Sequence, residues 1–199
     1  MNWNDLSIKD YNKIQELLSG ITDEVTMSER QEQILIEIGG YSQKELHTMP
    51  IMEFVRLFDK EFGFLSTEIP KQKPVKIYRA GWGIYKINYD ITKLSKGQYD
   101  EVVQFSSVSG MKNMHLYLAS VSTPVWWWPF GKKDHAGKAK DIEDSKFLVG
   151  YYISVFFYLL YRNLLADILT SLEGQTLTKE RREMLMNLLP TSDSFSTIS

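Results

Sequence analysis

Residues 147–161, FLVGYYISVFFYLLY, are fifteen consecutive positions without a charged side chain. This apolar run is shorter than the roughly 20 residues that a helix needs to span a bilayer, and Lys146 and Arg162 bound it with charges. It also lacks the polar face that a surface helix keeps. We therefore expect a helix that must be covered on every side, by the rest of its own fold or by a second subunit.

The composition is that of a globular domain. The chain has 199 residues, of which 43% are hydrophobic and 24% charged, and this length fits one domain. The absence of cysteine excludes disulfides and cysteine-based zinc sites. The N-terminus lacks the basic and apolar stretches of a secretory signal. This predicts an intracellular product, or a particle assembled inside a cell.

Charge is distributed unevenly along the chain. Residues 1–70 contain 6 Lys/Arg and 13 Asp/Glu, a net charge of −7, whereas residues 71–140 contain 12 and 4, a net charge of +8. Residues 141–199 contain 5 and 8, a net charge of −3. Such blocks let the acidic part dock on the basic centre of its own chain, or on that of the next chain in a head-to-tail ring. A basic centre also suits nucleic acid, and the remaining alternative is solvated charge without a partner.

Short amphipathic helices are predicted across residues 7–64, the acidic part of the chain. Apolar residues recur there at helical spacing, and each helix begins at a capping signal. These signals are Ser7, Ser28 with Gln31, Ser42 with Glu45, and Pro50. The last of these helices has the apolar set Ile51, Phe54, Val55, Leu57, Phe58 and Phe62.

A β-hairpin is predicted at residues 75–89. Its strands are Val75–Arg79 and Ile84–Asn88, and the sequence AGWG between them supplies the glycines of a turn. The connector before the hairpin, PKQKP, is basic, and its two prolines favour extended backbone.

Further helices and a long loop follow the hairpin. Ser95 and Gln98 form a capping box at the start of the next helix. The remaining segments are central helices at 95–122, a Trp-rich loop at 123–137, C-terminal helices at 138–190 and a Ser/Thr-rich tail at 191–199 that is either mobile or ordered only by a partner. The C-terminal helices are expected at about 138–148, 149–170 and 178–190. These elements predict a mainly α, single helical domain with a small central β-hairpin.

No residues stand at the spacing of a metal or catalytic site. The histidines, His47, His115 and His135, lack partners at metal-binding spacing. His47 is expected near a helix end and His115 to pack within a helix. Asp134 beside His135 is either an acid–base partner or, as we favour, the residue that starts a helix. Because phosphate-loop and nucleophile motifs are also missing, we expect a non-enzyme without cofactor or metal.

Aromatic side chains are the candidates for binding instead. Consecutive tryptophans point in different directions, so the loop VWWWPF cannot bury all of them in one core. Tryptophan is enriched at protein interfaces, and beside Lys132 and Lys133 the stretch Trp126–Phe130 also suits a membrane surface. A third alternative is packing under the apolar helix, and stacking on single-stranded nucleic acid lacks interleaved arginine. The candidate interface residues are Trp126, Trp127, Trp128, Phe130, Tyr151, Tyr152, Phe156, Phe157 and Trp82.

The run Val75–Phe105 carries a resemblance to a known group of proteins. Its hairpin is followed by DITKLSKGQY at residues 90–99. This order resembles a family encoded in the structural regions of tailed bacteriophages of Bacteroides-type hosts, crAss-like phages included, in which a hairpin precedes D-[IL]-T-K-L-[ST]-x-G-Q-Y. The N-terminal WNDLS and the later Asp134-His135, before a helical aromatic C-terminal part, fit the same pattern.

The resemblance implies a non-enzymatic virion or virion-assembly protein. Together with the sequence, it leads us to expect a structural or assembly component of a tailed phage, in the tail or head–tail region, that acts by protein–protein binding. Its partners would be other phage structural proteins and further copies of itself, with nucleic acid disfavoured, in the virion or in the host cytoplasm during assembly. Two alternatives stay open. One is a tail-assembly chaperone that is absent from the mature particle, and the other is an ejected or membrane-interacting virion protein that uses Trp126–Phe130.

Overall fold

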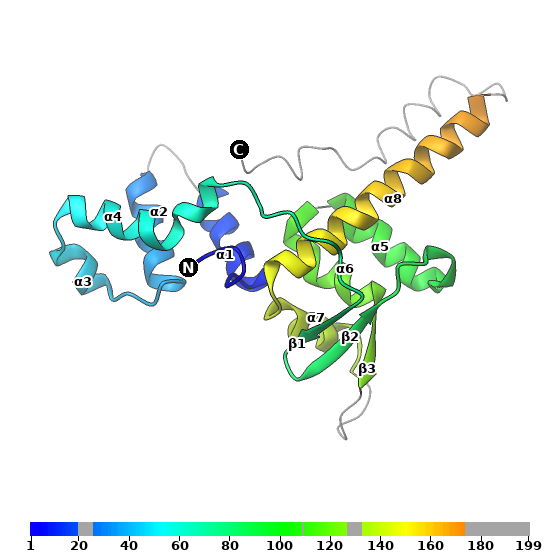
Figure 1. The fold of residues 1–199 in the computed structure, drawn as a ribbon, viewed down its shortest axis with the longest axis horizontal. Coiled ribbons are helices and arrows are strands. Elements are labelled where there is room, and N and C mark those ends of the chain that lie inside the picture. Colours follow the sequence, from blue (N-terminus) through cyan, green and yellow to red (C-terminus); the bar gives the residue numbers. More distant parts are fainter. Residues whose placement is uncertain (20–25, 109, 127–132, 174–199) are drawn as a thin grey trace.

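A computed structural model describes the chain except for residues 20–25, 109, 127–132 and 174–199. The fold is mainly helical, with one three-stranded antiparallel sheet, as Figure 1 shows. This confirms the prediction of a mainly α protein with a small central hairpin. The N-terminal helices α2, α3 and α4 lie at one end of the long axis, and the sheet lies in the other half.

The elements follow one another in this order. The N-terminal part contains α1 (Ile8–Ser19), α2 (Met27–Glu37), α3 (Gln43–Thr48), α4 (Ile51–Phe62) and the 3-10 helix η1 (Gly63–Ser66). The middle contains β1 (Ile77–Ala80), β2 (Gly83–Ile87), the 3-10 helix η2 (Ile91–Lys93), α5 (Lys96–Val108) and the 3-10 helix η3 (Gly110–Asn113). The remainder is α6 (Met114–Val121), β3 (Ser122–Trp126), α7 (His135–Glu143) and α8 (Phe147–Glu173).

Capping boxes start three of the helices. Two were predicted correctly, at Ser42 for α3 and at Ser95 for α5, where the Ser95 Oγ accepts the Gln98 N–H at 3.2 Å. The box predicted at Ser28 is wrong. Helix α2 is capped two residues earlier, by Thr26, whose backbone N–H donates to the Glu29 carboxylate at 2.7 Å. A carboxylate is the better acceptor there because it also interacts with the positive end of the helix dipole.

The boundaries of the C-terminal helices differ from those predicted. Helix α7 begins at His135 rather than 138, because the Asp134 Oδ1 accepts the Gly137 N–H at 2.8 Å and caps it. Helix α8 begins at Phe147, whose N–H donates to the Leu6 carbonyl at 2.9 Å. The backbone at this junction therefore pairs with the N-terminal segment instead of continuing α7. The helix predicted at 178–190 and the tail at 191–199 lie outside the described residues.

The sheet contains the predicted hairpin and one further strand. Gly81 and Trp82 form its two-residue turn, and Gly81 has φ 54°. A positive φ at the first central position alone is typical of a type II′ turn. The loop predicted at 123–137 is wrong at its start, since β3 pairs with β2 there, Thr123 opposite Lys86. Pro124 is compatible with β3 because an edge strand can lack one backbone donor.

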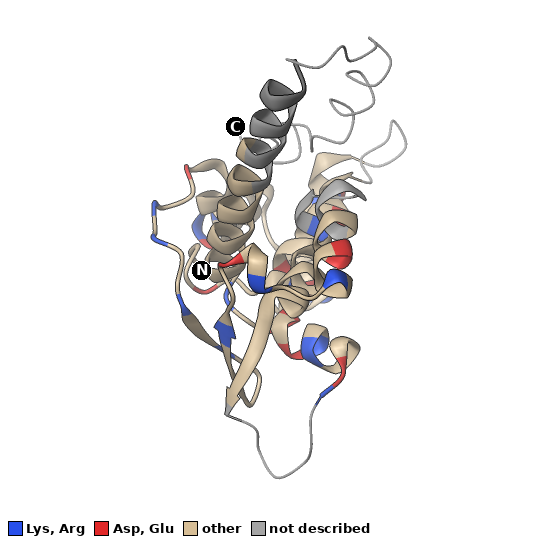
Figure 2. Ribbon diagram, turned by 90° about the vertical axis from the view of Figure 1, so that its right-hand side faces the viewer, with Lys and Arg blue, Asp and Glu red and all other residues tan. Residues whose placement is uncertain are grey.

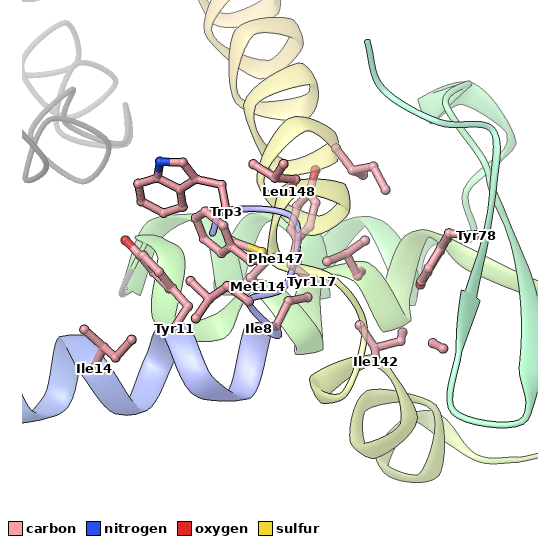
Figure 3. Close-up of a cluster of buried hydrophobic side chains, with 14 of the residues drawn as sticks. Trp3, Ile8, Tyr11, Ile14, Tyr78, Met114, Tyr117, Ile142, Phe147 and Leu148 are labelled. Atoms are coloured by element: carbon pink, nitrogen blue, oxygen red, sulfur yellow. The ribbon is translucent and has the colours of Figure 1, made fainter. Parts of the chain in front are cut away.

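The first half of α8 anchors the hydrophobic core shown in Figure 3. Phe147 is fully buried and stacks on Trp3, with ring centroids 5.6 Å apart, and on Tyr11, at 4.1 Å. Ile153 is also fully buried, whereas Leu159 is 46% exposed. Among the described side chains of the apolar run, one face is thus buried and the others are covered in part. Across the described residues, no helix has both the length and the apolar character to cross a membrane.

Candidate interaction surface

The register of the sheet brings two predicted interface segments to one end. Strand β3 runs antiparallel to β2, and Trp126 lies opposite Ile84, next to the turn that carries Trp82. The Trp82 side chain is 91% exposed. Of Trp126 only the backbone is described, and Trp127, Trp128 and Phe130 lie outside the described residues.

The inner face of the sheet is occupied by contacts with the rest of the fold. Tyr78 and Tyr85 stack there, with ring centroids 5.8 Å apart, and the Tyr78 hydroxyl lies 2.9 Å from the Ser122 Oγ. The Tyr85 hydroxyl donates to the Asp141 Oδ2 of α7 at 2.9 Å. Burial, followed by this contact, raises the pKa of Tyr85. Since the inner face is occupied, the outer face is the one that remains for a partner.

The outer face and the connector before it are basic and partly apolar. Residues 69–89 contain five Lys/Arg and no Asp/Glu, and within the described residues none of the five makes an ion pair. Ile77 is 54% exposed and Ile84 40%. We define the basic sheet face as the exposed residues Lys71, Lys73, Lys76, Ile77, Arg79, Trp82, Ile84 and Lys86. Figure 2 shows its cations along the connector and the hairpin.

The connector is held at both of its ends. The Tyr152 hydroxyl of α8 donates to the Pro70 carbonyl at 2.6 Å, and the Tyr89 hydroxyl donates to the Val75 carbonyl at 2.7 Å. Lys71 and Lys73 lie between these two anchors. Their positions relative to the sheet are therefore supported by the core.

The four aromatic candidates of α8 make contacts inside the chain. Phe156 and Phe157 pack on Tyr89, with ring centroids at 4.7 and 5.7 Å. Phe157 is 3% exposed and belongs to the core, whereas Phe156, Tyr151 and Tyr152 are half-buried. The structure thus places Trp82, and not Phe157, on a free surface.

A second exposed apolar surface lies at the other end of the molecule, and sequence reasoning missed it. Ile51, Met52 and Val55 of α4 are 66%, 61% and 42% exposed. We predicted Ile51 and Val55 on the buried side of this helix, but the residues buried there are Phe54 and Phe62. Neighbouring apolar residues at 51 and 52 were the available signal, because one narrow buried stripe cannot contain both.

Polar groups gather where α5, α6 and α7 meet. The Ser120 Oγ donates to the Glu101 Oε2 at 2.7 Å, and the His135 Nε2 lies 3.0 Å from that hydroxyl and 3.5 Å from the same carboxylate. A catalytic relay needs the hydroxyl and the carboxylate at opposite ring nitrogens. Here both lie at Nε2, and Ser120 is 1% exposed. The cluster therefore lacks the geometry of such a relay. Its contacts link α5, α6 and α7.

The C-terminal carbonyls of α6 are satisfied by side chains of the neighbouring helices. The Lys138 Nζ donates to the Ala119 carbonyl at 2.9 Å, and the Gln98 Nε2 donates to the Ser120 carbonyl at 2.9 Å. The last carbonyls of a helix lack partners within it, so these donors complete α6. Burial lowers the pKa of Lys138.

The other two histidines also have structural positions. His47 lies in the last turn of α3, as predicted for a helix end, with its Nε2 at 2.8 Å from the Glu32 Oε1. His115 of α6 packs among its neighbours, with its Nε2 at 3.3 Å from the Glu143 Oε1. Asp134 has the helix-starting role that we favoured. Among the described residues, no group of His, Asp and Glu is arranged to hold a metal ion.

The chain matches no protein-family model, and comparison with curated proteins and with solved structures gives no significant match.

Proposed function

We propose that this protein is a non-enzymatic structural or assembly component of a tailed bacteriophage, in the tail or head–tail region, and that it acts by protein–protein binding. The observation that carries the proposal is the basic sheet face, where Trp82, at 91% exposure, lies among cations that make no ion pair with any described residue. An exposed tryptophan buries a large area at little entropic cost when a partner covers it. The phage assignment rests on the resemblance of residues 75–105.

The sheet supports this proposal because it presents its outer face rigidly. Its inner tyrosines bond to Ser122 and Asp141, and its connector is anchored at Pro70 and Val75. A preorganised surface loses little conformational freedom when it binds. This is the property expected of a surface that docks on a larger assembly.

Mass spectrometry of purified virions tests the proposal. A structural component is expected in the particle at a constant ratio to the major structural proteins. A tail-assembly chaperone is expected only in infected cells, bound to another phage protein. Absence from both the particles and the complexes of infected cells would contradict the proposed function.

A membrane-interacting virion protein is the second candidate, because Trp82 beside lysines also suits an anionic bilayer surface. This candidate predicts flotation with anionic liposomes. Flotation should be lost in Trp82→Ala or in the triple variant Trp126→Ala/Trp127→Ala/Trp128→Ala. A wild-type protein that does not float would rule this candidate out.

A further inference from the structure

We infer that the basic sheet face docks on the α4 end of a second copy of this chain, a head-to-tail contact that rests on the proposed function of an assembly protein. The α4 end is defined here by the exposed residues of α4, which are Ile51, Met52, Glu53, Val55, Arg56, Asp59 and Lys60.

The basic sheet face and the N-terminal helices that include the α4 end have opposite net charge, and α4 itself exposes Arg56 and Lys60 beside Glu53 and Asp59. Residues 26–66, which include α2, α3 and α4, contain four Lys/Arg and seven Asp/Glu, a net charge of −3. Residues 69–89 contain five Lys/Arg and no Asp/Glu, a net charge of +5. Complementary potentials of this kind steer association and select its partner.

Both surfaces also expose aliphatic side chains at their centres. On α4, Ile51, Val55 and Asp59 follow one another at i, i+4 spacing, so they lie on one side of the helix. On the sheet, Ile84 lies opposite Arg79 and Ile77 lies opposite Lys86. Apolar and cationic side chains therefore alternate across the two strands. An apolar centre beside charged residues is typical of protein interfaces.

The placement of the two surfaces favours a contact between copies. Figure 1 shows α4 at one end of the long axis and the sheet in the other half, so the two do not meet within one chain in this structure. The ion pairs of Lys13 with Glu16 and Glu37, at 3.7 and 3.1 Å, remain within the acidic part. A contact between two different surfaces is heterologous, and such contacts generate rings or filaments.

Nucleic acid is a poorer occupant of the basic sheet face. A phosphate backbone would neutralise Lys73, Lys76 and Lys86, but it offers no aliphatic surface to cover Ile77 and Ile84, which are 54% and 40% exposed. The α4 end of a second copy offers both acidic groups and aliphatic surface. Nucleic acid therefore fits the basic sheet face less well than a second copy of the chain does.

Sedimentation velocity of the full chain, after nuclease treatment, tests the contact at ~50 mM and ~500 mM NaCl, since added salt screens exposed charges. The wild type is expected to associate at low salt and to dissociate at high salt. The variant Lys73→Glu/Lys76→Glu/Lys86→Glu reverses the charge of three lysines on the basic sheet face. The variant Glu53→Lys/Asp59→Lys reverses the charge of the two carboxylates on the α4 end. Each is expected to weaken association by about tenfold or more, because like charges then face each other.

The controls separate a specific contact from a general effect of charge. The variant Lys9→Glu/Lys112→Glu/Lys140→Glu changes the net charge as much as the basic-face variant, at exposed positions of α1, η3 and α7, and should associate like the wild type. Trp82→Ala changes no charge and should still weaken association. A mixture of the two charge-reversed variants should associate again, because each retains the surface that the other has lost. Circular dichroism checks that all variants are folded.

Three results would overturn the inference. They are a wild type that is monomeric at both salt concentrations, a control variant that associates as weakly as the basic-face variant, and a mixture of the two charge-reversed variants that stays monomeric. A monomeric wild type that binds single-stranded oligonucleotide through Lys73, Lys76 and Lys86 would assign this surface to nucleic acid instead. A monomer that is nevertheless found in virions would overturn the self-contact and leave the proposed function standing.

Discussion

At the scale of single residues, Gly150 shows how little free space the core has. A Cβ atom at this position would lie 2.7 Å from the Ile8 Cδ1 and against the Met114 sulfur. Both neighbours are themselves buried, at 0% and 1% exposure. They cannot move aside without displacing other core atoms.

We therefore expect Gly150→Ala to destabilise the protein. Overpacking costs about 1–3 kcal/mol, which exceeds the gain of up to about 1 kcal/mol from replacing a helical glycine. Gly97→Ala in α5 is the matched control, because a Cβ there meets nothing within 4 Å, and it should be neutral or slightly stabilising. Urea unfolding measures both variants, and an unchanged midpoint for Gly150→Ala would contradict the packing described here.

His115 makes stability depend on pH. Burial lowers its pKa, with Glu143 opposing and His135 reinforcing the shift, and its buried Nδ1 makes no hydrogen bond in the described part of the structure. A lowered pKa in the folded state means that the unfolded chain binds more protons as the pH falls through about 6.5. Stability is therefore fully present above this pH and decreases below it.

The variant His115→Leu should reduce this pH dependence. Between about pH 7 and about pH 5 its free energy of unfolding should fall less than that of the wild type, because one proton-binding site of the unfolded chain is gone. Urea midpoints at several pH values measure the difference. Equal slopes for the two proteins would contradict the assignment.

At the scale of elements, α6 depends on donors from its neighbours. It has eight residues, too few to be stable alone, and its final carbonyls accept from Gln98, from Lys138 and from the Asn88 N–H, which bonds the Val121 carbonyl at 2.9 Å. The helix is therefore stable only in its tertiary setting.

Lys138→Met tests this dependence. The substitution keeps much of the aliphatic stem but leaves the carbonyl of Ala119, a fully buried residue, without its donor. An unsatisfied buried carbonyl costs about 1–3 kcal/mol, so the midpoint of thermal unfolding should fall. Lys140→Met, two residues along α7 and exposed, should stay within about 0.5 kcal/mol of the wild type. Equal stability of the two variants would argue against the contact.

At the scale of the whole molecule, the N-terminal segment joins distant parts of the chain. The Trp3 Nε1 donates to the Thr67 Oγ1 at 3.2 Å, and its ring contacts Phe64 and Phe147 at 5.2 and 5.6 Å. The Lys146 Nζ donates to the Asn4 carbonyl at 2.8 Å. Residues near the start of the chain therefore hold η1 and α8 together.

Trp3→Ala should destabilise the protein by about 3–5 kcal/mol, the usual cost of removing a buried tryptophan. Trp82→Ala is the matched control, and at 91% exposure it should change stability by less than about 0.5 kcal/mol. Denaturant unfolding measures both variants. Similar losses in the two would contradict the division into a structural and a surface tryptophan.

Sequence reasoning succeeded where the deciding contact is local. The Ser42 and Ser95 caps join residues three apart, and the Gly81 turn depends on a φ that glycine adopts readily. The candidate surface was predicted only in part. Trp82 is on it, but the cations of residues 71–86 were predicted only as part of a basic segment and not as one surface. Phe157 is a core residue.

The sequence by itself determined the helical class, most caps, the hairpin turn and the apolar character of α8, because these follow from bonds and backbone angles within a few residues. Only the tertiary structure decided that α8 begins at Phe147, that Ser122–Trp126 is a strand, and that one face of the apolar run is covered by Trp3 and Tyr11. These outcomes depend on pairings between residues far apart, such as Leu6 with Phe147. Local patterns contain no information about which distant backbone will supply the missing hydrogen bond.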